Sequence, residues 1–274
     1  MRAPRVLLVG TADTKSAEIL YLREQIHALG GTTVVMDVGV LASARFEPEV
    51  SNRAVAEAAG TTLQRIAASA DENEAMAAMA RGASRLAAQL HQERCIDGLL
   101  ALGGTMGTDL ALDVANALPL GVPKVLLSTI AHSHLLPAQR IPPDLIMVLW
   151  AGGLFGLNSV CRSALSQAAG AIIGTCRASL PPSFERPVVG MTSLGSSNLH
   201  YMLHLKPALD ARGYEVAVFH TTGMGGRAFE TLAADGQFAA VFDFSLQELA
   251  NHVAGSCVTA GPDRLLGAGR AGVP

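Results

Sequence analysis

One short turn near the start of the chain concentrates hydroxyl, carboxylate and amine side chains. The segment GTADTK, residues 10–15, follows an apolar run and precedes a helical pattern. Thr11 and Thr14 could donate hydrogen bonds to phosphate oxygens, and Lys15 could add a positive charge. Asp13 could orient a metal-bound water. An ordinary capped helix start, with Thr14 or Asp13 as the N-cap, is the alternative, because the turn matches neither a Walker A loop nor a Rossmann fingerprint.

Two later strand ends are also rich in small and hydroxyl residues. ALGGTMGTDLA, residues 101–111, carries three glycines and two threonines, and LLSTIAHSH, residues 126–134, contains another strand end. Glycine lets backbone N–H groups approach a ligand closely, and a helix N-terminus favours anions. The candidate binding residues in these two segments are Gly103, Gly104, Thr105, Gly107, Thr108, Ser128 and Thr129.

Three such strand ends would meet in one crevice of a doubly wound sheet, because ligands bind there at the carboxyl ends of the strands. The pattern therefore predicts a nucleotide or phosphate site, with Gly10 at the end of the first strand. Asp37, in MDVG at residues 36–39, stands where dinucleotide-binding folds place their ribose-binding carboxylate. Arg81 could reach a phosphate from a flanking helix, although a solvated arginine is the alternative.

The elements that must position these turns alternate along the chain. We predict strands at residues 6–9, 33–38, 98–102, 124–128 and 144–150, and helices at 16–29, 109–117 and 159–173. The alanine-rich stretch 55–90 is expected to be mostly helical, with breaks at Gly60 and Gly82. Alternating helices and continuously apolar strands predict a parallel sheet that is covered on both faces.

The proline-rich segment SLPPSFERP, residues 179–187, interrupts this order and predicts a boundary between subdomains 1–180 and 185–274. Beyond it the pattern recurs, with an apolar strand ending in Gly190 as the first strand ends in Gly10. We expect two Rossmann-like, doubly wound α/β subdomains related by an internal repeat, although any two βαβ units look broadly alike. The tripeptide GVP precedes a strand in the first half and ends the chain in the second, so we expect the second subdomain to be truncated.

Three further groups of residues could bind or react, and each has an ordinary alternative. His132 and His134, with Asp144, could form a metal or acid–base site, or could be idle loop residues. The glycine-rich turn 220–230 could bind a phosphate or carboxylate, or be an ordinary tight turn. The serine-rich turn 190–198 has no charged residue, and a small anionic substrate suits it better than a second nucleotide.

The composition argues against several kinds of partner. The net charge is −3 and the basic residues are scattered, so no nucleic-acid surface is expected. No apolar run reaches the roughly 18 residues that a membrane span needs, and the N-terminus lacks the apolar core of a signal peptide. The four cysteines are widely spaced, which argues against disulfides and zinc. We expect a cytoplasmic protein.

Several motifs taken together resemble the Tm-1-like ATP-binding family, which is also known as UPF0261. They are GTADTK, MDVG, GGTMGTDLA, GVPKVLLSTIA and GYEVAVFHTTGMGGRAFE, in this order along nearly the whole chain. The resemblance implies two Rossmann-like subdomains, ATP bound by the first and a homodimer. Members of that family run longer than this chain. The residues alone indicate phosphate, and the resemblance supplies ATP, which we expect to bind with Mg²⁺.

The sequence is consistent with two classes of function. The first is a nucleotide-binding protein that holds the phosphates of ATP at the strand-to-helix turns of the first subdomain. The alternative is an ATP-dependent enzyme that acts on a small organic acid bound by the second subdomain. Steady ATP turnover with a particular metabolite would favour the enzyme, and tight ATP binding without turnover would favour the binding protein.

Overall fold

The computed structural model describes residues 2–69, 71–136, 140–180, 182 and 185–274. The chain divides into two compact units. The first unit comprises Met1–Leu136 and Asp144–Pro181, and the second comprises Pro137–Pro143 and Pro182–Pro274.

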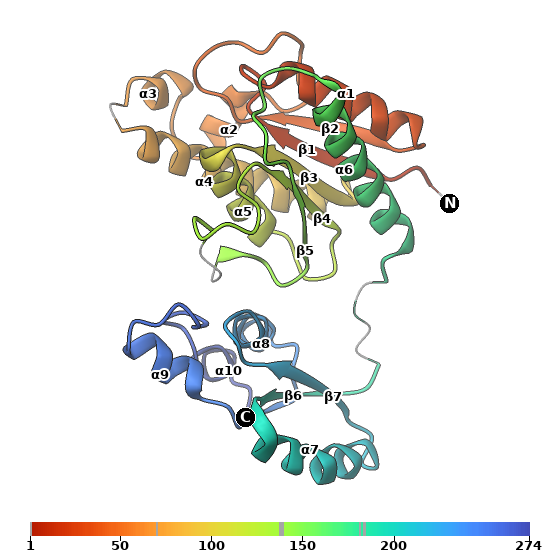
Figure 1. Cartoon of the computed structure of the whole chain (residues 1–274), viewed down its shortest axis with the longest axis vertical. Coiled ribbons are helices and arrows are strands. Elements are labelled where there is room, and N and C mark those ends of the chain that lie inside the picture. The colour runs from red at the N-terminus through yellow and green to blue at the C-terminus, as the bar shows by residue number, and fades with distance from the viewer. Residues whose placement is uncertain (1, 70, 137–139, 181, 183–184) are drawn as a thin grey trace. The chain divides into compact units, whose positions relative to one another are not determined.

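The first unit contains a five-stranded parallel sheet in the order β2-β1-β3-β4-β5 (Figure 1). Its strands are β1 (Arg5–Gly10), β2 (Thr32–Asp37), β3 (Gly98–Gly103), β4 (Lys124–Ser128) and β5 (Leu145–Leu149). Every residue of β3 and β4 is buried, as expected for central strands covered on both faces. All five predicted strands are confirmed, and their carboxyl ends lie at one edge of the sheet.

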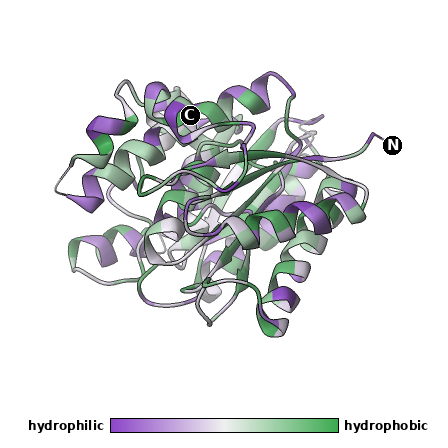
Figure 2. Cartoon of the chain, turned by 90° about the horizontal axis from the view of Figure 1, so that it is seen from above, coloured by the Kyte–Doolittle hydropathy of each residue, from purple (hydrophilic) through white to green (hydrophobic). Residues whose placement is uncertain are grey.

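The helices of the first unit cover both faces of this sheet. They are α1 (Ser16–Ala28), α2 (Asn52–Ala58), α3 (Leu63–Ala67), α4 (Glu72–Gln92), α5 (Thr105–Asn116) and α6 (Ser159–Ala178). Ile19 and Leu22 of α1 share one apolar core with α6 and with Val6 and Leu8, which point to the same face of β1. Helices α4 and α5 pack against each other, outside that core. In Figure 2 the helices carry both purple and green segments, as expected for helices with one buried side.

Two details of the predicted helices are wrong. Helix α4 continues through Gly82, where we predicted a break, because this glycine lets α4 cross close to α2. A Cβ at residue 82 would overlap the backbone oxygen of Val55. Helix α5 begins at Thr105 instead of Asp109, with Gly104 as its extended N-cap residue. The break at Gly60 is confirmed, with a φ of +78°.

The second unit contains a three-stranded parallel sheet in the order β7-β6-β8. Its elements are β6 (Val188–Ser193), α7 (Gly195–Asp210), β7 (Glu215–His220), α8 (Met224–Ala234), β8 (Ala240–Asp243), α9 (Gln247–Val253) and α10 (Gly267–Ala271). Phe219, Phe229 and Phe238 form an aromatic cluster here, with ring centroids 5.6–5.8 Å apart. The order of these strands matches β2-β1-β3 of the first unit.

The two units repeat one another down to single hydrogen bonds. The backbone oxygen of Pro123 accepts from Leu99 N at 2.8 Å, and that of Pro274 accepts from Val241 N at 2.9 Å. The two GVP tripeptides therefore occupy equivalent places beside β3 and β8, and the internal repeat is confirmed.

The predicted equivalence of Gly10 and Gly190 between the two repeats is wrong by three residues. Gly10 pairs with the last residue of β2, and in the second unit Ser193 pairs with the last residue of β7. The residue equivalent to Gly10 is thus Ser193, while Gly190 lies inside β6. A Cβ at Gly190 would come within 2.7 Å of the Phe238 ring, so this glycine makes room for the aromatic cluster.

None of the described helices combines the length and the apolar character needed to cross a membrane.

Candidate functional site

A cavity of about 610 Å³ opens at the carboxyl ends of β1 and β3. Of the residues predicted from the sequence, those that line it are Thr11, Asp13, Thr14, Lys15, Gly103, Gly104, Thr105 and Gly107. The first four lie between β1 and α1, whereas Gly103 ends β3, Gly104 links it to α5, and Thr105 and Gly107 belong to the first turn of α5. Two of the three predicted turns are therefore brought together.

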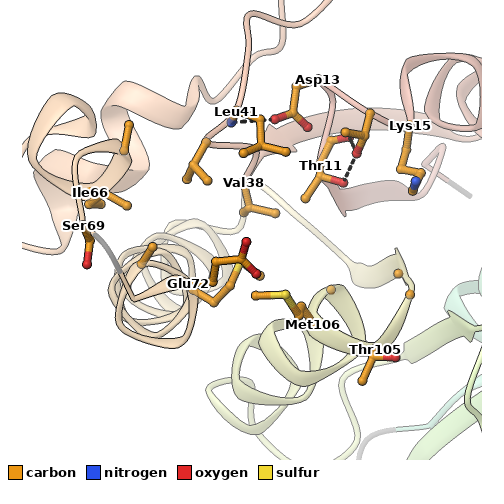
Figure 3. Close-up of a pocket in the computed structure, with 18 residues that line it drawn as sticks. Thr11, Asp13, Lys15, Val38, Leu41, Ile66, Ser69, Glu72, Thr105 and Met106 are labelled. Carbon is orange, nitrogen blue, oxygen red and sulfur yellow. Dashed lines mark hydrogen bonds between the residues drawn. The ribbon is translucent and has the colours of Figure 1, made fainter.

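The rest of the cavity lining is mostly apolar and comes from three other segments. Val38, Val40 and Leu41 follow β2, Ile66 belongs to α3, and Met76 belongs to α4. Ser69 and Glu72 add two polar groups. Figure 3 shows Glu72 and Met106 facing Val38 and Thr11 across the space.

The hydroxyl groups of the first turn are not used to cap α1. The N-cap residue is Lys15, and no side chain caps the helix, so the capped-start alternative is wrong. Thr11 Oγ1 and Thr14 Oγ1 lie 2.9 Å apart and share a hydrogen bond at the cavity wall (Figure 3). The backbone oxygen of Thr11 accepts from Lys15 N at 2.9 Å, which closes the turn.

Asp13 joins this turn to the segment after β2. Its Oδ2 accepts hydrogen bonds from Leu41 N at 2.9 Å and from Ala42 N at 3.4 Å. Its Oδ1 is buried and has no hydrogen-bond partner among the described residues. Because an unpaired buried carboxylate oxygen is costly, a bound cation or a ligand hydroxyl would stabilise this group.

Asp37 lies behind the cavity and does not line it. Its side chain is 2% exposed, and its Oδ1 accepts from Ala12 N at 2.9 Å and from Gly39 N at 2.8 Å. Burial raises the pKa of Asp37, against these two hydrogen bonds, which lower it. Asp37 therefore holds the turn in place, and the structure does not place it where it could contact a ribose in this cavity.

The remaining candidates stabilise the turns or lie at other surfaces. Thr108 Oγ1 and Ser128 Oγ form a buried hydrogen bond of 2.7 Å between α5 and β4. A Cβ at Gly10 would come within 2.7 Å of Leu102, so Gly10 is needed for packing. Thr129 lines a separate, smaller cavity on the other side of Lys15. Arg81 lines a third cavity.

The histidine pair and Asp144 do not form a site. His132 follows β4, whereas Asp144 precedes β5, so the two lie at opposite ends of neighbouring parallel strands. Asp144 Oδ2 accepts from Lys124 Nζ at 2.6 Å, and Lys124 is 2% exposed. Burial lowers the pKa of Lys124 and the hydrogen bond to Asp144 opposes that change. The described residues hold no cluster of three His, Cys, Asp or Glu side chains that could ligate a metal ion.

In the second unit, the glycine-rich turn before α8 already holds a carboxylate. Glu248 Oε1 accepts from the backbone N–H groups of Gly223 and Gly226 at the start of this helix. Thr192 donates to Asp243 and Asn198 to Ser245, so polar residues of the serine-rich turn are also engaged. Anion binding at these two turns stays a prediction from the sequence.

A buried cluster of charges surrounds Arg264, a residue that none of the sequence motifs includes. Its guanidinium is fully buried and forms ion pairs with Glu230 at 2.9 Å, with Glu248 at 3.0 Å and with Asp243. Burial opposes the charge of Arg264, but these carboxylates outweigh it and raise its pKa. The four residues lie in separate segments of the chain, so no local sequence motif indicates the cluster.

Models of one protein family match both units. The N-terminal domain of the uncharacterised protein family UPF0261 matches residues 4–181, and its C-terminal domain matches residues 186–274.

Named relatives agree with this assignment. A UPF0261 protein of Brucella suis biovar 1 (strain 1330) is 58% identical over 272 residues, which cover 99% of this chain and 65% of that protein. The chain thus spans just under two thirds of that relative's length. The ToMV resistance protein Tm-1(GCR237) of Solanum lycopersicum is 30% identical over 288 residues, covering 96% of this chain and 37% of that protein.

Among solved structures, the glycosyltransferase SnogD from Streptomyces nogalater aligns over 93% of this chain and 80% of its own, at 15% identity. The TM-score of 0.30 is too low to indicate a shared fold. The matches to both of its domain models and to the Brucella protein show that the chain belongs to the uncharacterised protein family UPF0261.

Proposed function

We propose that the first unit binds ATP in the 610 Å³ cavity, with the phosphates at the turns 10–15 and 103–107. The observation that carries this proposal is the meeting of Lys15 with the N-terminus of α5 in one cavity that also has an apolar wall. These residues indicate a ligand that is anionic at one end and apolar at the other. The resemblance to the Tm-1-like ATP-binding family supplies ATP.

The phosphate end of the site combines a fixed charge with backbone donors. The first N–H groups of a helix have no partner within the helix, and they carry a partial positive charge that favours phosphate. Helix α5 presents such groups at Thr105, Met106 and Gly107, all of which line the cavity. Within the described parts of the chain no ion pair joins Lys15 to a carboxylate, so its charge is available to a ligand.

The other wall suits a flat aromatic base. Val38, Leu41 and Met76 offer an apolar surface of the kind that lines small-molecule pockets. Glu72 and Ser69 lie beside it and could accept from or donate to ribose hydroxyls or the adenine amino group. Asp13, with one buried and unpaired oxygen, is the carboxylate that fits a Mg²⁺ ion or its bound water.

Replacing Lys15 with alanine is expected to weaken ATP binding by about 1.5–3 kcal/mol, the usual value of a hydrogen bond to a charged group. Isothermal titration calorimetry with MgATP measures this change directly. Arg81→Ala is the matched control, since it removes a cation from an exposed position outside the cavity and should leave the affinity unchanged. Equal affinities of wild type and Lys15→Ala would contradict the site.

An ATP-dependent enzyme acting on a small organic acid is the second candidate function. The sequence led us to expect the acid in the second subdomain, but the observation that favours this function is a smaller cavity of the first unit, which adjoins Lys15 and Thr105. An acid bound there would lie beside the proposed nucleotide. ATP turnover that depends on an added acid would support this function. ATP binding without turnover, whichever acid is added, would support the nucleotide-binding function instead.

A further inference from the structure

A second cavity, of about 410 Å³, lies on the far side of Lys15 from the proposed nucleotide cavity. Both cavities are lined by Lys15, Gly104 and Thr105. The second one is completed by Thr129, at the end of β4, and by the loop 151–155 after β5. Lys15 and the start of α5 therefore separate two spaces, and both spaces have access to the same positive charge.

The lining of the second cavity has one polar side and one apolar side. Lys15 and the Thr129 hydroxyl supply a cation and a hydrogen-bond donor. Ala151, Leu154 and Phe155 supply carbon surface opposite them. The Lys15 ammonium lies 5.1 Å from the centroid of the Phe155 ring, a cation–π contact that holds the lysine at the mouth of the cavity.

The loop that forms the apolar side is fixed by several hydrogen bonds. Trp150 N donates to Ser128 O at 3.0 Å, and Trp150 Nε1 donates to Gly153 O at 3.1 Å. Gly156 N donates to the buried carboxylate of Glu18 at 2.8 Å. Because a Cβ at Gly152 would overlap the Trp150 ring, the indole packs directly against the loop backbone. Such a preformed wall is typical of ligand sites.

We propose that this second cavity binds a small carboxylic acid, with its carboxylate on Lys15 and Thr129 and its carbon chain against Leu154 and Phe155. A carboxylate fits better than inorganic phosphate because half of the lining is carbon surface that a tetrahedral oxyanion could not contact favourably. The placement of the acid beside the terminal phosphate rests on the proposed ATP site. The acid site shares Lys15 with the nucleotide cavity but can be tested without ATP, since Thr129 and loop 151–155 do not line that cavity.

Trp150 makes a direct test possible, because it is the only tryptophan of the chain. Its emission should change in a saturable way when butyrate or succinate is added to the full chain. Thr129→Val removes the hydroxyl at nearly constant volume, and Phe155→Ala removes a ring that is 92% exposed. Thr129→Val should raise the dissociation constant of the acid about tenfold, as the loss of one hydrogen bond to a charged group predicts, and Phe155→Ala should raise it as well. Leu41→Ala, which touches only the nucleotide cavity, should leave it unchanged.

The two proposals fail in different ways. MgATP affinity, measured by calorimetry without any acid, tests the nucleotide site alone. The acid site is overturned if neither acid gives a saturable change, if Thr129→Val and Phe155→Ala bind the acids like wild type, or if inorganic phosphate saturates the signal at lower concentration than both acids. Retained acid binding in a protein that does not bind MgATP would support the acid site and reject the nucleotide site.

Discussion

Replacing Arg264 with methionine is expected to unfold the second unit at denaturant concentrations that leave the first unit folded. The free energy of unfolding of the second unit should fall by about 3–5 kcal/mol, the cost of removing one partner from a buried ion pair. The change removes the cation that pairs with Glu230, Asp243 and Glu248.

The size of this effect follows from the burial of the carboxylates. Glu248 has a fully buried side chain, and those of Glu230 and Asp243 are 11% and 15% exposed. In the native cluster one guanidinium forms ion pairs with all three carboxylates, and backbone N–H groups such as Gly267 N donate hydrogen bonds to the remaining carboxylate oxygens. Without the guanidinium, three negative charges would face one another in a medium of low dielectric constant, where repulsion is strong.

The two units can be followed separately in one experiment. Trp150 lies in the first unit, so its fluorescence reports the unfolding of that unit, while far-UV circular dichroism reports both. Arg264→Met should therefore produce an early dichroism transition that is absent from the fluorescence. Arg270→Met is the matched control, because Arg270 and its partner Asp263 are 64% and 67% exposed and such pairs contribute about 0–1 kcal/mol.

A second substitution identifies the cause. Adding Glu248→Gln to Arg264→Met removes one buried charge and keeps an oxygen that can accept from Gly223 N and Gly226 N. This double variant should recover part of the lost stability. Wild-type unfolding of Arg264→Met would contradict the predicted loss of stability. A loss that Glu248→Gln does not reduce would mean that lost packing, and not unpaired charge, is the cause.

The strands and their order of appearance follow from local sequence, which explains why these predictions are confirmed. The middle of β4, residues 125–127, is apolar because the strand is buried on both faces, and this property is visible without any knowledge of its neighbours. The repeat was visible for the same reason. Its register was not, because the apolar run of β6 continues past Gly190 into Met191 and Thr192 and only the pairing with β7 shows where the strand ends.

Only part of the cavity lining could be predicted from the sequence. Thr11 and Lys15 stand in a turn whose polarity contrasts with the strand before it, so this part of the cavity lining could be predicted. The apolar part of the lining comes from the segment after β2 and from α3 and α4, whose side chains are ordinary apolar residues in sequence. Asp37 shows the converse. Its place in the sequence matched that of the ribose-binding carboxylate of dinucleotide-binding folds, but its Oδ1 accepts hydrogen bonds from Ala12 N and Gly39 N.

Gly82 is the position where a side chain as small as a methyl group should disturb the apolar part of the cavity lining. The glycine lies inside α4, where helix propensity alone would favour any other common residue except proline. The structure explains it by contact, because a Cβ would overlap the backbone oxygen of Val55 and lie 2.9 Å from its carbonyl carbon. Both are backbone atoms, so no side-chain rotation can relieve the overlap, and α2 or α4 must move.

Gly82→Val is therefore expected to lower the free energy of unfolding of the first unit by about 3 kcal/mol, the upper end of the usual cost of overpacking. The matched control is Gly170→Val in α6, a glycine with open space around it, which should change stability by at most about 0.5 kcal/mol. Denaturant unfolding followed through Trp150 measures both variants. Equal effects at the two positions would show that α2 yields without cost.

The same substitution links the packing of α2 to the proposed nucleotide site. Helix α2 leads into α3, which carries Ile66, and α4 carries Met76, so both sides of the strained crossing contribute to the apolar wall. Gly82→Val should weaken MgATP binding under conditions in which the variant is still folded, whereas Gly170→Val should not. A folded Gly82→Val protein with wild-type affinity would mean that the base does not rest on this wall, and the phosphate turns would then have to account for the binding energy alone.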